Sequence, residues 1–269
     1  GPVDTNHRTA PLGVVITRNP QPNRRPAVGR GGDVLACGLL AAWYVLMYGD
    51  CTRHFFHWDD FRLLGEASRL SITRPVDLWQ IFRPGPTATL FYRPLSEKFY
   101  FWLLGKLFGH DAAPYHAVQL CANIANAILV YAIASTILRS RRAGLGTAMV
   151  YAAAPGHTIG AYWIAAFSMT GTAFWYFASI LGWTRLRGRA RTIVCLLTFG
   201  IALLHGEAAI TVPLALTITP LADRTPSARE RLQALLPLYI LGTAYGCAKA
   251  WYFRFGVAVQ FPDPLGRAY

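Results

Sequence analysis

Charged residues are scarce in this 269-residue chain: Asp, Glu, Lys and Arg together make up 14% of it, whereas soluble domains contain roughly 25%. Only 13 residues are acidic, and all but three of the 26 basic residues are arginines. This composition excludes an acidic or disordered tail protein, a collagen and a small disulfide-rich scaffold. We also expect no nucleic-acid partner, despite the net charge of +13, because a basic excess on so apolar a chain is typical of membrane topology determinants.

The cysteine pattern indicates neither a metal site nor a disulfide framework. The five cysteines form no C-x-x-C pair and have no histidine at metal-ligand spacing. Four of them lie in apolar stretches, where a cysteine usually acts as a small buried apolar residue. We therefore expect no disulfide framework; the residues are Cys37, Cys51, Cys121, Cys195 and Cys247.

Apolar residues are what the chain has in abundance. They account for 54% of it, and its mean hydropathy is +0.30. The first apolar run begins only at Val34, so we expect no cleavable signal peptide. Since about 20 apolar residues span a bilayer, the sequence predicts single crossings at 34–49, 112–138 and 232–253, and two crossings each within 143–183, around a turn at Pro155–Gly156, and within 192–222.

Arginine clusters set the expected orientation. They lie in the stretches 139–142, 185–191 and 224–231 and in the first 32 residues, and short arginine-rich loops face the cytoplasm. The prediction is an all-α integral membrane protein with about seven transmembrane helices. Residues 1–33 form a flexible basic cytoplasmic arm, and 34–269 form the membrane domain. Its large external loop at 50–111 carries surface helices such as 95–108, and the tail from Arg254 is also external.

One crossing pair is short. Residues 192–222 are fewer than two full crossings need, so the turn His205-Gly206-Glu207 is expected below the outer membrane surface. An ionisable residue at such depth is costly and suggests a functional site. The alternative is that Glu207 only pairs with an arginine inside the helix bundle.

Two segments of the external loop carry candidate chemistry. His57-Trp58-Asp59-Asp60 places two carboxylates side by side; they can supply a general base or bind a divalent cation, without requiring one. Arg93 follows Tyr92 at the start of an amphipathic stretch and can bind a phosphate. The simpler alternatives are a solvated loop or helix cap for the acidic pair, and for Arg93 a side chain that reaches into the headgroups.

Taken in order, these segments resemble the GT-C fold glycosyltransferases that use polyprenyl-phosphate sugars, especially the branch with bacterial protein mannosyltransferase-like proteins and the TMTC proteins. The resemblance covers about residues 34 to 255. The segments that carry it are Trp58-Asp59-Asp60, Tyr92-Arg93-Pro94-Leu95, Leu107-Phe108-Gly109, Tyr115-His116, Asn123 with Asn126, Pro155-Gly156-His157, Gly206-Glu207 and Val212-Pro213-Leu214.

The resemblance implies an inverting transfer of a sugar from a polyprenyl-phosphate lipid to the hydroxyl of a protein or glycan acceptor on the external face. The membrane would be a bacterial inner membrane or the endoplasmic reticulum. Asp59 would be the general base, with Asp60 and Glu207 in the same active site. Arg93 would stabilise the phosphate. The implied substrate-binding residues are Arg93, Tyr92, His157 and His57.

Two other classes of function stay open at this point. A non-catalytic relative of the same fold would be a structural subunit of a larger membrane complex, surrounded by membrane lipids. A channel or transporter has little support, because the sequence has no inverted repeat and few intramembrane charges.

Overall fold

The computed structural model describes residues 30–83, 91–219 and 228–253. Every regular element in these ranges is helical, which confirms the all-α class. In chain order the elements are α1 (Arg30–Tyr48), η1 (Gly49–Arg53), α2 (Asp59–Ser68), η2 (Pro75–Leu78), α3 (Trp79–Phe82), η3 (Pro94–Phe99), α4 (Tyr100–Phe108), α5 (Ala112–Leu138), α6 (Arg141–Ala152), α7 (His157–Tyr162), η4 (Ile164–Ala166), α8 (Phe167–Arg185), α9 (Gly188–His205), η5 (Glu207–Thr211), α10 (Val212–Ile218) and α11 (Ala228–Phe253).

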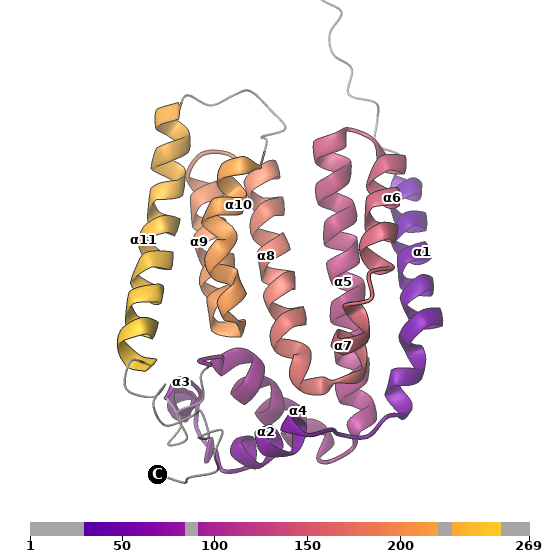
Figure 1. Ribbon diagram of the computed structural model, residues 1–269, viewed down its shortest axis with the longest axis vertical. Helices are drawn as coiled ribbons and strands as arrows, with labels where there is room; N and C mark the ends of the chain where they lie inside the picture. The colour runs from indigo at the N-terminus through magenta and orange to yellow at the C-terminus, as the bar shows by residue number, and fades with distance from the viewer. Residues whose placement is uncertain (1–29, 84–90, 220–227, 254–269) are drawn as a thin grey trace, which may run out of the picture.

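The long helices lie side by side as a bundle, and the segment from α2 to α4 crosses one end of it (Figure 1). Helix α5 packs against α1, α6 and α8, while α8 also packs against α9. One apolar core joins α1, α5, α6 and α7, and another joins α8, α9, α10 and α11. Helices α5 and α8 therefore connect the two halves of the bundle.

Small residues bring α5 and α6 close together. A Cβ atom at Gly144 of α6 would lie 2.0 Å from Ser135 Oγ of α5, so this position requires glycine. Ala127, Ala148 and Ala152 are fully buried in the same core. Close helix contacts through Gly and Ala are typical of helices that pack within a membrane.

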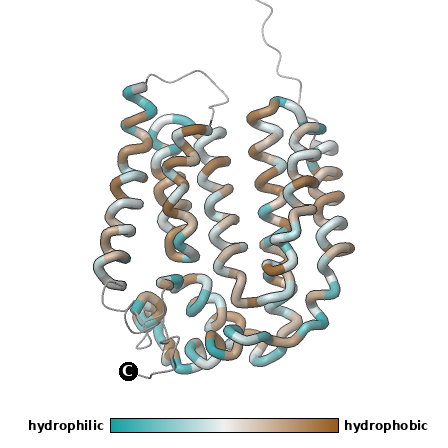
Figure 2. The backbone as a smooth tube through the Cα atoms, viewed as in Figure 1, coloured by the Kyte–Doolittle hydropathy of each residue, from teal (hydrophilic) through white to brown (hydrophobic). Residues whose placement is uncertain are grey.

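Within the described residues, four helical segments are long and apolar enough to cross a membrane. They span Gly31–Arg53, Ala112–Leu138, Ile164–Arg185 and Gly188–His205. Large apolar side chains on the bundle point outwards, and Val34, Leu46, Val150 and Ile218 are each more than 70% exposed. Figure 2 shows hydrophobic residues along the bundle helices. Outward apolar faces of this extent fit a lipid environment.

Several predicted helix positions agree with the structure. Residues 112–138 form α5 with the predicted bounds, and 34–49 and 232–253 fall largely within α1 and α11. The block 143–183 contains α6, α7 and most of α8. The chain turns at Pro155–Gly156, but α7 continues in the direction of α6 (Figure 1), and the reversal into α8 follows at 163–166. The proline interrupts the helix because it lacks an N–H and excludes helical geometry before it.

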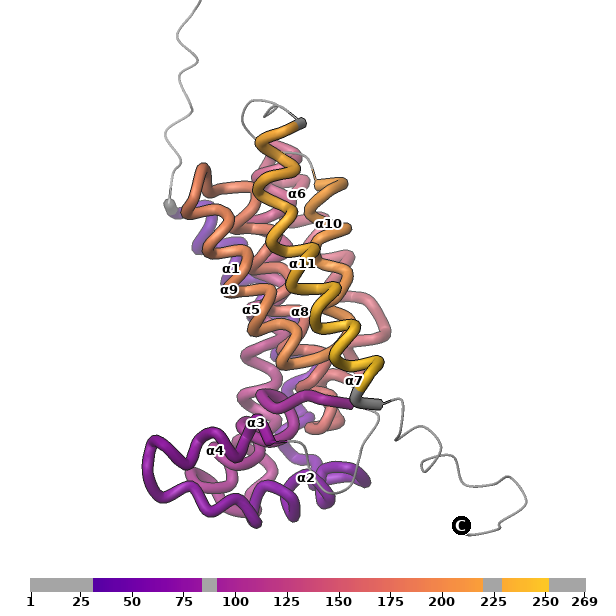
Figure 3. The backbone as a smooth tube through the Cα atoms, turned by 90° about the vertical axis from the view of Figure 1, so that its left-hand side faces the viewer, coloured from indigo at the N-terminus to yellow at the C-terminus, as the bar shows by residue number. Residues whose placement is uncertain are grey.

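The predicted loop 50–111 is largely helical. Its surface stretch 95–108 corresponds to η3 and α4, and the Tyr100 ring stacks on Phe167 of α8 with their centroids 3.9 Å apart. Figure 3 shows α2, α3 and α4 gathered across the lower end of the bundle. Outside the described residues lie most of the predicted basic arm (1–29), Arg224 of the third arginine cluster and the tail from Arg254.

Candidate active site

Arg93 lies where the segment from α2 to α4 meets the bundle. Pro94 begins η3, a π-helix, an element that occurs often at functional sites. Ser96 Oγ donates to the His205 carbonyl at the end of α9 over 2.7 Å, which fixes η3 to the bundle. The Arg93 guanidinium lies 3.9 Å from the centre of the Phe91 ring, and this stacking favours one orientation of the cation.

Glu207 is the principal partner of Arg93. Arg93 Nε donates to Glu207 Oε2 over 2.8 Å, and Lys249 Nζ of α11 lies 2.7 Å from Glu207 Oε1. The Tyr92 backbone N–H also donates to Glu207, over 3.3 Å. Glu207 thus holds two cations from distant parts of the chain, and one of them is an arginine, the kind of partner named above as the alternative to a functional role.

Asp59 and Asp60 open α2 but have different surroundings. Asp60 is fully buried, and its two carboxylate oxygens accept the backbone N–H groups of His57 (2.8 Å) and Ala165 (2.7 Å). Burial raises the pKa of Asp60, although these two hydrogen bonds oppose the shift. Asp60 therefore attaches the start of α2 to the segment before α8.

The residue before this acidic pair, Trp58, has a strained backbone conformation. Its φ angle is +39°, a region that costs a non-glycine residue about 1–3 kcal/mol, and its side chain is 88% exposed. The hydrogen bond from His57 to Asp60 closes the turn around Trp58. This turn leads directly into α2, which begins at Asp59.

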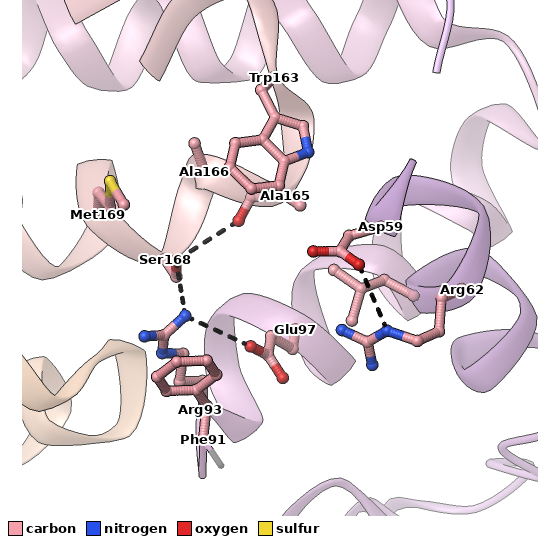
Figure 4. A pocket seen from close by; sticks show the side chains of 11 residues that line it. Asp59, Arg62, Phe91, Arg93, Glu97, Trp163, Ala165, Ala166, Ser168 and Met169 are labelled. Carbon is pink, nitrogen blue, oxygen red and sulfur yellow. Dashed lines mark hydrogen bonds and ion pairs between the residues drawn. The ribbon is translucent and has the colours of Figure 1, made fainter. Parts of the chain in front are cut away.

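Asp59 and Arg93 line the same cavity, which has a volume of about 490 Å³. It lies between α2 and η3 on one side and the start of α8 on the other. Figure 4 shows the side chains that surround it; the polar ones are Asp59, Arg62, Arg93, Glu97, Trp163 and Ser168. Asp59 is 53% exposed, and its Oδ1 lies 3.7 Å from Arg62 Nε. Such a carboxylate is accessible to a ligand in the cavity.

Glu97 is a further acidic group in the cavity that the sequence interpretation missed. Its Oε1 lies 3.6 Å from Arg93 Nη1. Burial raises the pKa of Glu97 to about 7, although the charges of Arg93 and Arg62 lower it. The i, i+4 spacing from Arg93 was the available signal. Near neutral pH, Glu97 therefore exchanges a proton beside the guanidinium.

Lys249 and Ser168 were also missed. Ser168 Oγ accepts a hydrogen bond from Arg93 Nη1 over 3.4 Å, and Lys249 contacts Glu207 from α11. Neither residue lies near Arg93 in sequence, so no local pattern could have predicted these contacts.

The remaining predicted site residues have other surroundings. Tyr92 directs its hydroxyl to the Phe82 carbonyl (2.8 Å). His157 Nε2 lies 2.8 Å from the Tyr151 carbonyl and so completes a hydrogen bond at the end of α6. His57 packs near His54, with ring centroids 6.4 Å apart. The structure thus brings Asp59 and Arg93 to one cavity and adds Glu207 through its ion pair with Arg93. Asp60 and the two histidines make structural contacts.

The described residues contain no group of three or more His, Cys, Asp or Glu side chains arranged to hold a metal ion. No family model matches the chain, and neither a curated protein nor a solved structure matches it. The chemistry of the cavity therefore has to be derived from its own residues.

Proposed function

We propose that this chain is an integral-membrane glycosyltransferase that takes its sugar from a polyprenyl-phosphate lipid. The observation that carries this proposal is the shared cavity of Asp59 and Arg93, at the end of helices that are long and apolar enough to cross a membrane. A donor with a membrane-embedded tail presents its phosphate and sugar at this level. A carboxylate and a guanidinium are the two groups that transfer from a phosphate requires.

In the proposed reaction, Asp59 accepts the proton of the acceptor hydroxyl. The acceptor oxygen forms a bond to C1 of the sugar while the bond between C1 and the phosphate oxygen breaks, with inversion at C1. The bonding electron pair leaves with the phosphate, and the products are the glycosylated acceptor and polyprenyl phosphate. Arg93 stabilises the charge that develops on the leaving phosphate.

The charges around Arg93 suit a singly charged donor. Arg93 and Lys249 face one firmly paired carboxylate, Glu207. When Glu97 carries a proton, the four side chains Arg93, Lys249, Glu207 and Glu97 together have a net charge of +1. A phosphodiester donor brings one negative charge, so its binding leaves the site neutral in a region where uncompensated charge is costly.

We propose the following topology for the enzyme. The α6–α7 pair and the η5–α10 pair each complete a crossing, and α11 forms the last, for seven in all. The arginine-rich connections face the cytoplasm, and α2 to α4 lie on the external face with the cavity. The acceptor, a protein or a glycan, approaches from that side.

The test is sugar transfer by the purified chain in liposomes, with radiolabelled polyprenyl-phosphate sugars offered one at a time alongside membrane acceptors. Asp59→Asn is expected to lower transfer at least 100-fold, since positioned general bases contribute about 10²–10⁴-fold, while folding is retained. Glu66→Gln, on the same helix, is the matched control and should keep most of the activity. Wild-type turnover in Asp59→Asn would remove the general-base assignment.

A second proposal is a non-catalytic structural subunit that retains this fold. It is favoured by the ion pairs, because Glu207 and Glu97 already engage Arg93 and Arg62 already faces Asp59. For such a subunit, Arg93→Ala would lower stability without changing which lipids bind. For the enzyme, the same substitution would weaken binding of the phosphate-bearing donor.

A further inference from the structure

A second cavity, of about 330 Å³, lies between α11 and the η5–α10 segment. Ile210 and Pro213 line one side, and Tyr239, Gly242, Thr243 and Gly246 of α11 line the other. Thr243 and Cys247, on the α11 side, are exposed. The cavity is therefore a mostly apolar groove that opens on the outside of the bundle.

Two glycines of α11 that line the groove also pack closely against other helices of the same chain. A Cβ atom at Gly242 would lie 3.3 Å from Phe199 Cζ of α9, and one at Gly246 would lie 3.2 Å from Ile210 Cδ1. The Gly-x-x-x-Gly pattern is thus already used for packing within the chain. It does not form a free face for another transmembrane helix, which is its frequent role in membranes.

Polar contacts lie beside the first and the last of the α11 residues that line the groove. At one end, Thr217 Oγ1 and the Tyr239 hydroxyl are 2.8 Å apart. At the other end, Lys249 Nζ lies 2.7 Å from Glu207 Oε1, and Glu207 Oε2 accepts from Arg93 of the active-site cavity. Lys249 follows Gly246 by three residues and Gly242 by seven, so it continues the face of α11 that lines the groove. Through Glu207, this end of the groove is linked to Arg93, which lines the cavity of Asp59.

We propose that this groove between α10 and α11 holds the first isoprene units of the donor's tail, next to its phosphate, and that Lys249 binds the donor phosphate together with Arg93. The inference rests on the proposed function and adds the lipid-binding site to it. An apolar groove that leads to paired cations complements a ligand with a slender apolar chain and an anionic end. A partner helix would need a longer open face than a groove of about 330 Å³ offers.

The experiment is native mass spectrometry of the purified full chain in detergent, with undecaprenyl phosphate, undecaprenol and phosphatidic acid added separately. Undecaprenyl phosphate is expected to bind at least tenfold more tightly than either of the others, because only it has both the tail and the phosphate. Thr243→Trp fills the groove from an exposed position and should weaken this binding at least tenfold. Ala244→Trp, one residue along the same helix and outside the groove lining, should leave it unchanged.

A second pair of variants separates the tail from the phosphate. Cys247→Trp should repeat the effect of Thr243→Trp, with Ala248→Trp as its control. Lys249→Gln should reduce the affinity for undecaprenyl phosphate towards that for undecaprenol. Thermal unfolding of each variant verifies that the fold is intact.

Three results would overturn the inference. They are equal binding of phosphatidic acid and undecaprenyl phosphate, unchanged binding in both tryptophan variants, and a second protein chain that dissociates when the groove is filled. A different result would overturn the proposed function while leaving the lipid-binding site in place. Undecaprenyl phosphate that binds in the groove without any sugar transfer would retain the lipid site and remove the enzyme.

Discussion

Asp59 and Asp60 show how adjacent residues acquire different roles. Successive residues on a helix point about 100° apart, so one carboxylate enters the cavity while the other is buried against Ala165. The sequence predicted an acidic pair at the membrane surface. Only the structure separates an accessible carboxylate from a structural one.

Asp60→Ala should therefore destabilise the protein more than Asp59→Ala does. Two backbone N–H groups would lose their acceptor, at about 1–3 kcal/mol for each buried group left unpaired. Asp59 is half exposed, and its loss should change stability by no more than about 0.5 kcal/mol. Thermal unfolding in detergent measures both variants. Equal melting temperatures would contradict the structural role of Asp60.

The proton on Glu97 should make donor binding depend on pH. Its pKa is about 7, well above the ordinary value, so the carboxyl is neutral below pH 7 and competes for Arg93 only above it. A phosphodiester donor keeps its single charge over this range. We expect affinity for a polyprenyl-phosphate sugar to fall as pH rises from 6 to 8 in the wild type.

Glu97→Gln supplies the control for this pH dependence. The amide cannot ionise, so the same titration should be flat and remain near the low-pH affinity. The raised pKa also means that the wild type loses stability as pH rises from about 4.5 to 7. A variant that keeps the wild-type pH profile would show that another group titrates.

At the scale of helices, hydropathy predicted the long, continuously apolar helices best. Helix α5 has the predicted bounds because both of its ends are marked in the sequence. It begins after Asp111, whose Oδ1 caps the helix by accepting a hydrogen bond from the Ala113 backbone N–H. It ends where the apolar stretch meets an arginine cluster. The direction of α7 was less accessible to sequence reasoning. A proline marks a break, but whether the chain then reverses depends on packing against α5 and α8.

The candidate site shows the same division between local sequence patterns and tertiary packing. Asp59 and Arg93 belong to short segments with recognisable residue types, so they could be found. The link from Glu207 to Lys249 joins η5 to α11 across 42 residues of chain, and only tertiary packing brings them together.

The ion pairs of Glu207 should hold η3, η5 and α11 together. Glu207→Gln leaves Arg93 and Lys249 near each other without their anion, and we expect a loss of about 1–3 kcal/mol in unfolding free energy. Lys249→Gln leaves Glu207 paired with Arg93 and should cost less than about 1 kcal/mol. Unfolding in mixed detergents compares the two. A larger loss in Lys249→Gln would place the main partner of Glu207 elsewhere.

For the whole molecule, the proposed orientation predicts which connections an impermeant thiol reagent reaches. Helix α2 and the α8–α9 connection lie at opposite ends of the bundle (Figure 1). Single cysteines can be introduced near each end, at Ser71, three residues after α2, and at Arg189, in the first turn of α9. In intact cells or vesicles of known sidedness, Ser71→Cys should be labelled from the external face and Arg189→Cys only after permeabilisation. The opposite pattern would invert the topology and place the cavity in the cytoplasm.

The most direct test of a lipid-phosphate site beside Asp59 is native mass spectrometry of the chain extracted gently from its own membrane. We expect a bound polyprenyl-phosphate species that is retained in Asp59→Asn and lost in Arg93→Ala, because in the proposed reaction Arg93 binds the phosphate while Asp59 acts on the acceptor. The mass of that species would also show whether its sugar is a pentose, a hexose or an N-acetylhexosamine. A chain found only within a larger complex and carrying ordinary phospholipids would contradict the transferase and support a structural subunit.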